Sequence, residues 1–112
     1  MLKTETIGNV TVAGFENEKR FNALITEPVK EQIKGFFKEP NGKVALSLDG
    51  INFIDSSGFG VFLSVLKSAN SNSGQFKICS VREDVMELFK LLQLHNVFEI
   101  YPDVSSCVKS FD

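Results

Sequence analysis

The sequence predicts an α/β fold in which helices pack on a small mixed β-sheet. The chain opens with a hairpin pattern, and short apolar runs then alternate with longer stretches of helical periodicity. This alternation favours parallel strands joined by crossover helices, while the hairpin adds an antiparallel strand. With 112 residues, of which 43% are apolar, the chain is expected to form a single domain over residues 1–112.

The N-terminal third is expected to form a hairpin and then a helix. Residues 4–7 and 10–15 have the composition of two short strands at a sheet edge, and Gly8-Asn9 between them suits a tight turn. Thr26 is the expected N-cap of a helix that runs to about Lys38. Glu27 and Pro28 fit its first turn, and its buried face is expected to hold Val29, Ile33, Phe36 and Phe37.

The middle of the chain is expected to form a strand, a helix and a second strand. Pro40 and Gly42 interrupt the first helix, and the apolar residues of segment 43–49 then lie at its centre, as in an inner strand. A helix is expected over residues 57–69, ended by a polar turn in which Gly74 is the C-terminal signal. Residues 75–79 alternate between polar and apolar side chains and form the next expected strand.

The C-terminal third continues this alternation. Ser80 and Glu83 have the S-x-x-E spacing of a capping box, so a third helix is expected to begin there. Residues 97–101 are expected to form the last strand, and Pro102-Asp103 to start a terminal helix. The third helix is expected to bury Val85, Leu88, Phe89 and Leu92, and the terminal helix Val104, Val108 and Phe111.

Composition and charge narrow the classes of function. The formal net charge is −2, and the 12 Lys and Arg residues form no run of the kind that binds nucleic acid. No apolar segment approaches the ~20 residues that span a bilayer, and the N-terminus lacks the apolar region of a signal peptide. We therefore expect a cytoplasmic protein without direct membrane insertion. Cys79 and Cys107 are expected to be reduced core thiols, and a disulfide would need the fold to bring them together.

The most informative segment is residues 49–66, which read D-G-I-N-F-I-D-S-S-G-F-G-V-F-L-S-V-L. A strand is expected to end here and to place Ser56 and Ser57 at the start of an apolar helix. Side-chain oxygens at such a position accept hydrogen bonds from unpaired amides of the first turn, so Asp55 and Ser56 are both ordinary capping residues. The same amides and the positive end of the helix dipole also favour a phosphoryl group. Capping and phosphorylation of Ser56 both stay open at this point.

A helical projection from Ser56 separates two faces of the expected helix. The face expected to pack on the sheet holds Gly58, Phe59, Phe62, Val65, Leu66 and Ala69. The opposite face, a shallow surface that a partner could approach closely, holds Ser56, Gly60, Leu63, Ser64 and Lys67. The alternative is purely structural: Gly60 permits close helix packing, and Leu63 lies at the rim of the core.

Together these segments resemble the STAS family, which comprises the anti-sigma factor antagonists and their relatives. The resemblance covers roughly residues 43–111. It rests on the strand and D-S-S-G turn, the aliphatic residues after the turn, the G-Q-F-K-I-C strand and the V-x-E-L-F-K-L-L-x-L-x-x-V-F-E-I-Y segment. It implies a non-enzymatic cytoplasmic switch protein whose strands and helices alternate around a small sheet.

The resemblance also implies partners and a phosphorylation site. Family members bind a GHKL-type serine kinase that also serves as an anti-sigma factor, and this binding frees the sigma factor. The kinase phosphorylates the first serine of the D-S-S-G turn, and a metal-dependent PP2C-type phosphatase reverses the reaction. In this chain the implied phosphoacceptor is Ser56, with Asp55 beside it and with Ser57 and Gly58 shaping the turn. The added charge, about −1.5 to −2, would repel a docked partner or be costly to desolvate.

Two positions depart from the family pattern. Before the first helix the family usually carries a G-E-L-D-like segment, whereas residues 19–22 read K-R-F-N. Asn22 replaces the aspartate and keeps a turn-forming side chain without its charge. Because this loop commonly lies near the partner surface in the family, Asn22 is an expected partner-binding residue. After the third helix, Gln93 occupies a position where glycine is frequent, and it is expected to disfavour a left-handed cap.

The residues give little support to an enzyme or a cofactor-binding protein. His95 is the only histidine and lies far along the chain from Ser56, and the G-x-S-x-G pattern is absent. G-x-G-x-x-G fails because Leu63 occupies the third glycine position. One histidine and two distant cysteines do not indicate a metal site, so neither metal nor cofactor is expected. A second binding function stays open, because similar small STAS proteins are cytoplasmic subunits of lipid-transporting ABC complexes, where they bind the ATPase.

Overall fold

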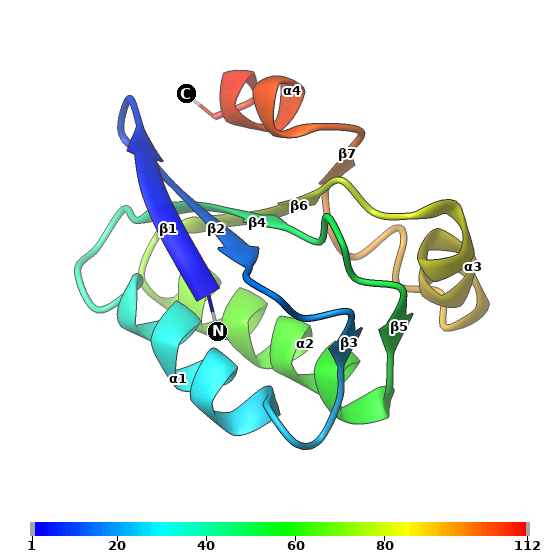
Figure 1. Ribbon diagram of the computed structural model, residues 1–112. Coiled ribbons are helices and arrows are strands. Elements are labelled where there is room, and N and C mark those ends of the chain that lie inside the picture. Colours follow the sequence, from blue (N-terminus) through cyan, green and yellow to red (C-terminus); the bar gives the residue numbers. More distant parts are fainter. Residues whose placement is uncertain (1, 112) are drawn as a thin grey trace.

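A five-stranded mixed sheet forms the centre of the computed structural model, which describes residues 2–111 (Figure 1). β1 (Leu2–Ile7) pairs antiparallel with β2 (Val10–Phe15), and all other neighbouring strands of this sheet are parallel. This confirms the mixed α/β fold, the hairpin at the sheet edge and the inner position of residues 43–47. Met1 and Asp112, which the expected domain includes, lie outside the described residues. The order across the sheet is β1 (Leu2–Ile7), β2 (Val10–Phe15), β4 (Lys43–Ser47), β6 (Gln75–Cys79) and β7 (Ile100–Tyr101).

Helices cover the two faces of the sheet unequally. The helices are α1 (Thr26–Gly35), α2 (Ser56–Ser71), α3 (Glu83–Leu91) and α4 (Val104–Lys109). In Figure 1, α1 and α2 lie side by side under one face, and α4 lies over the other. Because side chains alternate along a strand, Val44 and Leu46 of β4 pack in the larger core with α1, α2 and α3, whereas Ala45 packs with α4.

Phenylalanine rings fill the larger core. The ring of Phe62 in α2 is fully buried and lies 5.5 Å from Phe21, 6.1 Å from Phe59, 6.1 Å from Phe89 and 6.3 Å from Phe98, measured between ring centroids. Aromatic pairs at such separations contribute stability beyond the apolar area that they bury. One residue of α2 is thereby packed against three other parts of the chain, which fixes how α2 lies against the sheet.

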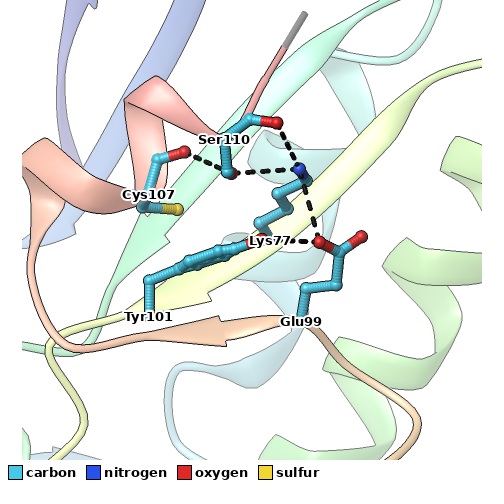
Figure 2. Close-up of polar contacts among 5 residues, drawn as sticks. All are labelled: Lys77, Glu99, Tyr101, Cys107 and Ser110. Carbon is cyan, nitrogen blue, oxygen red and sulfur yellow. Dashed lines mark hydrogen bonds and ion pairs between the residues drawn. The ribbon is translucent and has the colours of Figure 1, made fainter.

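The smaller core contains a buried lysine (Figure 2). Lys77 of β6 is 5% exposed, and its ammonium group donates hydrogen bonds to the carbonyl and hydroxyl oxygens of Ser110, each at 3.0 Å. Its Nζ also lies 3.4 Å from Glu99 Oε1 and over the rings of Tyr101 and Phe111. A buried cation is tolerated when it is paired and hydrogen-bonded, as it is here. These contacts tie the end of α4 to β6.

Cys79 and Cys107 are both free and fully buried, which confirms the prediction of two core thiols. The fold does bring them together, in the cluster that α4 forms with the sheet. A hydrogen bond with Cys79, together with burial, raises the pKa of the Cys107 thiol above its usual value. Cys107 is therefore a neutral thiol at neutral pH.

A second, two-stranded sheet precedes α2 and is absent from the sequence-based expectations. β3 (Arg20–Phe21) pairs in parallel with β5 (Phe53–Ile54), and the Arg20 guanidinium lies 4.2 Å from the centroid of the Phe53 ring. β4 ends at Ser47, so β5 and not β4 leads directly into α2. Two-residue strands are too short to show an alternating pattern, so no sequence signal marks them.

Two predicted helix starts are wrong. Thr26 is not the N-cap of α1 but its first residue; the N-cap is Ile25, whose N–H is already bonded to the Asn22 carbonyl. Ser80 does not open a capping box, because its φ is +61° and its N–H donates to the Tyr101 carbonyl at 3.1 Å. α3 begins three residues later, at Glu83. At Ser80 a hydrogen bond to the distant residue Tyr101 sets the backbone, whereas at Thr26 a local turn bond from Ile25 to Asn22 precedes the helix start.

Two elements are shorter than predicted. α1 ends at Gly35, about one turn early, because the N–H groups of residues 36 and 37 bond to carbonyls only three residues back. β7 lacks residues 97–99, since the N–H groups of residues 97 and 98 bond to the Leu94 carbonyl in a turn. Leu92 follows the last residue of α3 and is 49% exposed, so its predicted place in the core is wrong.

The residues that end α2 and α3 adopt left-handed conformations without glycine. Ser73 has φ +56° and Gln93 has φ +59°, and the N–H that follows each bonds to a carbonyl five residues back. Gln93 thus forms the left-handed cap that it was expected to disfavour. Gly74 is not the left-handed residue; a Cβ there would lie only 2.8 Å from the Phe37 side chain, so its role is close packing.

We predict that Lys77→Ala lowers the free energy of unfolding by roughly 2–3 kcal/mol, because it removes both the buried stem and the bonds to Ser110. Lys77→Met is the matched variant, since it keeps most of the stem volume and loses only the ammonium group. Its loss should be smaller, about 1 kcal/mol. Urea denaturation followed by circular dichroism measures both. Equal losses in the two variants would show that the stem contributes nothing.

Candidate functional site

Asp55 caps α2 and fixes the conformation of the D-S-S-G turn. Its backbone is extended, with φ −92° and ψ −180°, as is typical of an N-cap. Its Oδ1 atom accepts hydrogen bonds from the Ser57 hydroxyl at 2.6 Å and from the Gly58 N–H at 3.1 Å. A carboxylate therefore lies at the positive end of the helix dipole. Of the two capping residues that the sequence suggested, the one that caps α2 is Asp55.

The same carboxylate joins the turn to a loop 32 residues earlier in the chain. Its Oδ2 atom accepts a hydrogen bond from the Ala23 N–H at 3.2 Å, and the Asp55 N–H donates to the Phe21 carbonyl at 3.2 Å. Asn22 lies between them, and its Oδ1 atom accepts from the Leu24 N–H at 3.1 Å, the turn-forming role expected of it. The structure thus brings Asn22 and the D-S-S-G turn side by side.

The two serines of the turn differ in what their hydroxyl groups do. The Ser57 hydroxyl donates to Asp55, and the residue is half-buried. Ser56 is the first residue of α2 and is exposed. Within residues 2–111 its hydroxyl makes no hydrogen bond. Ser56 therefore presents a hydroxyl oxygen that is accessible from solvent and is not held by the protein.

Burial along α2 agrees with the helical projection. Ser56, Gly60, Leu63 and Lys67 are exposed and form one stripe along the helix, here called the α2 stripe, with Ser64 half-buried beside it. Gly58, Phe59, Phe62, Val65 and Ala69 are buried on the opposite side, together with Val61. Leu66 is only partly buried. The burial of the predicted core face is thus correct except at Leu66, while the part that the α2 stripe plays in binding stays a prediction.

The sequence-based prediction missed an exposed leucine beside the turn. Leu24 lies in the loop that the Asp55 carboxylate holds, and 88% of it is accessible to solvent. Leu63 of the α2 stripe is 42% exposed. An exposed leucine in a loop that is held against the D-S-S-G turn is a candidate contact for another protein. Leu24 carries no helical or strand periodicity, so only its position next to Asn22 could have indicated it.

Gly58 and Gly60 occupy opposite sides of α2 and meet different surroundings. A Cβ at Gly58 would lie 2.7 Å from Ile54 Cγ2 and 2.9 Å from Phe21 Cδ2, so glycine lets α2 start against the β3–β5 pair. A Cβ at Gly60 would meet nothing within 4 Å. Close helix packing, the structural explanation considered for Gly60, therefore applies to Gly58 instead.

Among residues 2–111, no group of three or more His, Cys, Asp or Glu side chains is placed to hold a metal ion. His95 is exposed in the loop after α3. In the same part of the chain, no helix combines the length and the apolar character needed to cross a bilayer.

Comparison with known proteins finds relatives over most of the chain. The STAS domain family matches residues 4–107. A Thermotoga maritima protein that carries the provisional name of anti-sigma factor antagonist is 31% identical over 74 residues. That match spans 66% of this chain and 66% of the relative, just under two thirds of its length. The anti-sigma-B factor antagonist of Bacillus subtilis is 25% identical over 97 residues, 82% of this chain and 89% of the relative.

Solved structures share the fold at lower identity. An anti-sigma-factor antagonist (STAS) domain protein from Planctomyces limnophilus gives a TM-score of 0.89 at 20% identity, covering 97% of this chain and 96% of that one. The Bacillus cell fate determinant SpoIIAA in its phosphorylated form gives a TM-score of 0.70 at 12% identity, covering 97% of each chain. These matches establish the fold.

We predict opposite stability changes for Gly58→Ala and Gly60→Ala. The methyl group at position 58 would press on Ile54 and Phe21, so this variant should lose about 1–3 kcal/mol of unfolding free energy. Gly60→Ala adds a methyl group in open space and removes a glycine from a helix, so it should gain up to ~1 kcal/mol. Thermal and urea unfolding measure both. A Gly58→Ala variant as stable as Gly60→Ala would contradict the packing described here.

The hydrogen bonds at the cap predict how Asp55 titrates. The Ser57 hydroxyl, and with it the N–H groups of Gly58 and Ala23, lower the pKa of Asp55 below its usual value despite some desolvation. A lowered pKa means that Asp55 stabilises the fold above its unfolded-state pKa, and that this contribution is lost as the pH falls through the folded-state pKa. Carbon-detected NMR should show a low midpoint for Asp55 and a higher one in Ser57→Ala. An unchanged midpoint in Ser57→Ala would contradict this assignment.

Proposed function

Because this chain belongs to the STAS family, we propose that it is a single-domain, non-enzymatic switch protein that binds a serine kinase acting as an anti-sigma factor. Binding in the cytoplasm would withdraw the kinase from its sigma factor. The names of the relatives support an anti-sigma factor as the partner. The observation that carries the proposal is the exposed hydroxyl of Ser56 at the start of α2, which makes no hydrogen bond to the described residues 2–111.

Ser56, and not Ser57, is the proposed phosphoacceptor. Phosphoryl transfer needs a hydroxyl oxygen that can reach the γ-phosphate of ATP in the kinase site. The Ser56 hydroxyl is accessible, whereas the Ser57 hydroxyl is held 2.6 Å from Asp55 Oδ1. A phosphoryl group on Ser56 would also lie at the positive end of the α2 dipole, where the helix tolerates it. The solved phosphorylated form of SpoIIAA, which shares this fold, supports a modification of this kind.

Phosphorylation would end binding locally, without a change of fold. The proposed docking surface consists of Asn22 and Leu24 in the loop, the D-S-S-G turn, the α2 stripe and Ser64. A phosphate adds about −1.5 to −2 charges beside Asp55, which its lowered pKa keeps ionised. A partner that buries this surface would have to desolvate both charges. The family resemblance also implies a PP2C-type phosphatase. Because Ser56 is exposed, this enzyme would have access to the phosphate and would restore the hydroxyl group.

We predict that incubation with the cognate kinase and ATP adds one phosphate to the protein and that Ser56→Ala abolishes the addition. Ser57→Ala is the matched control, since it removes the neighbouring hydroxyl and leaves Ser56 in place. Intact-mass spectrometry measures each. Phosphate on the Ser56→Ala variant would show that Ser56 is not the acceptor.

A further variant of Ser56 separates docking from stability. Ser56→Asp should weaken kinase binding at least tenfold, because it places a carboxylate in the centre of the proposed surface. It should leave the melting temperature nearly unchanged, because the first turn of α2 contains no acidic residue and an aspartate there suits the dipole. Calorimetric titration and thermal unfolding measure the two quantities. A large fall in melting temperature would instead give Ser56 a structural role.

Purification of the protein from its native cells tests the identity of the partner. A co-purifying serine kinase supports the proposal. A membrane ABC ATPase in its place would overturn it in favour of a subunit of a lipid transport complex, the alternative that the family also offers.

A further inference from the structure

A basic groove runs between α1 and α2 on their outer side. It has a volume of about 860 Å³. Lys34 and Lys38 line it from the α1 side, and Ser64, Lys67 and Ser68 line it from α2. Because Ser64 and Lys67 also belong to the proposed docking surface, the groove continues that surface away from Ser56. At a rise of ~1.5 Å per residue, Lys67 lies about 16 Å along α2 from Ser56.

Three lysines give the groove its positive charge. Within residues 2–111, the ammonium groups of Lys34, Lys38 and Lys67 form no ion pair or hydrogen bond, although lysines and an arginine elsewhere do. Glu31 is the one acidic residue among the described residues that line the groove. The whole chain has a net charge of −2, so this concave region has the opposite sign to the chain. A cleft lined by one sign of charge attracts the other sign.

The helix dipoles account for Lys34 but not for Lys67. Lys34 lies in the last turn of α1, where a basic residue stabilises the helix end. Lys67 precedes the last turn of α2, which contains no basic residue.

Gly35 also lines the groove, and a Cβ there would meet nothing within 4 Å. Its missing side chain keeps the groove open to an approaching chain.

We infer that the α1–α2 groove binds an acidic segment of the partner protein, with carboxylates against Lys34, Lys38 and Lys67. The inference rests on the proposed function, in which the kinase covers Ser56 and the adjoining α2 stripe. Leu24 in the loop beside the turn and Leu63 between Ser56 and Lys67 are exposed and supply apolar contact, so the occupant has apolar residues along the α2 stripe and acidic residues at Lys67. A protein segment of this mixed character suits the surface better than a nucleic acid, whose uniform negative charge a chain of net charge −2 repels.

Charge reversal tests the groove with the kinase obtained by co-purification. Lys34→Glu with Lys67→Glu should weaken binding at least tenfold at low salt and flatten the salt dependence of the affinity. The matched control is Lys3→Glu with Lys109→Glu, the same change of charge in β1 and α4, which should change the affinity less than threefold. Equal losses in the two double variants, or wild-type affinity in the groove variant, would overturn the inference. If Ser56→Asp still blocks binding in that case, the proposed function stands without the groove.

A second measurement does not depend on the kinase. An acetylated and amidated hexaglutamate peptide is titrated into ¹⁵N-labelled protein at low salt. Amide shifts should concentrate in residues 31–38 and 64–72 and should vanish in the Lys34→Glu, Lys67→Glu variant. Shifts of equal size around Lys3 and Lys109 would overturn the inference. Shifts confined to the groove, together with no kinase binding, would support the groove and contradict the proposed function.

Discussion

The burial of Phe62 determines which side of α2 meets solvent. Its ring packs against Phe21, Phe59, Phe89 and Phe98, so it draws β3, α3 and the segment before β7 onto one side of the helix. A close-packed interior leaves little freedom for the helix to turn about its axis. The positions on the opposite side are therefore held outward, whatever their side chains are. The exposure of the α2 stripe therefore follows from the packing of the core on the other side of the helix.

Asp55 adds a second constraint, because one carboxylate holds both the helix start and a distant loop. Its three donors come from Ala23, Ser57 and Gly58, and they use both of its oxygen atoms. The neighbouring hydroxyl of Ser56 is left out of this network. Adjacent serines thus have different roles: Ser57 completes the turn, and Ser56 is available to another protein. Because the Asp55 carboxylate beside Ser56 is already ionised, a further negative charge at Ser56 would oppose the binding of a partner more strongly.

The sequence predicts well those features that the periodicity of apolar residues determines. The long segments, the order of strands and helices and the two faces of α2 follow from residue spacing and agree with the structure. Predictions fail where contacts between distant segments decide the backbone, as at Ser80, whose N–H pairs with Tyr101, and at the β3–β5 pair. Within the site, spacing places Ser56 and its neighbours, whereas Leu24 is missed because the exposure of a loop residue follows no period.

The two edges of the sheet bear on where a partner can bind. β1 is exposed along most of its length, with Lys3 and Glu5 alternating with threonines, and β7 at the other edge is only two residues long. Charged side chains and short strands both discourage another chain from adding a strand to a sheet. Strand addition at these edges is therefore disfavoured. Such pairing uses backbone hydrogen bonds and would recognise little about a partner beyond its extended conformation. Under the proposed function, recognition then falls to the side chains of the helical layer, which can distinguish one partner from another.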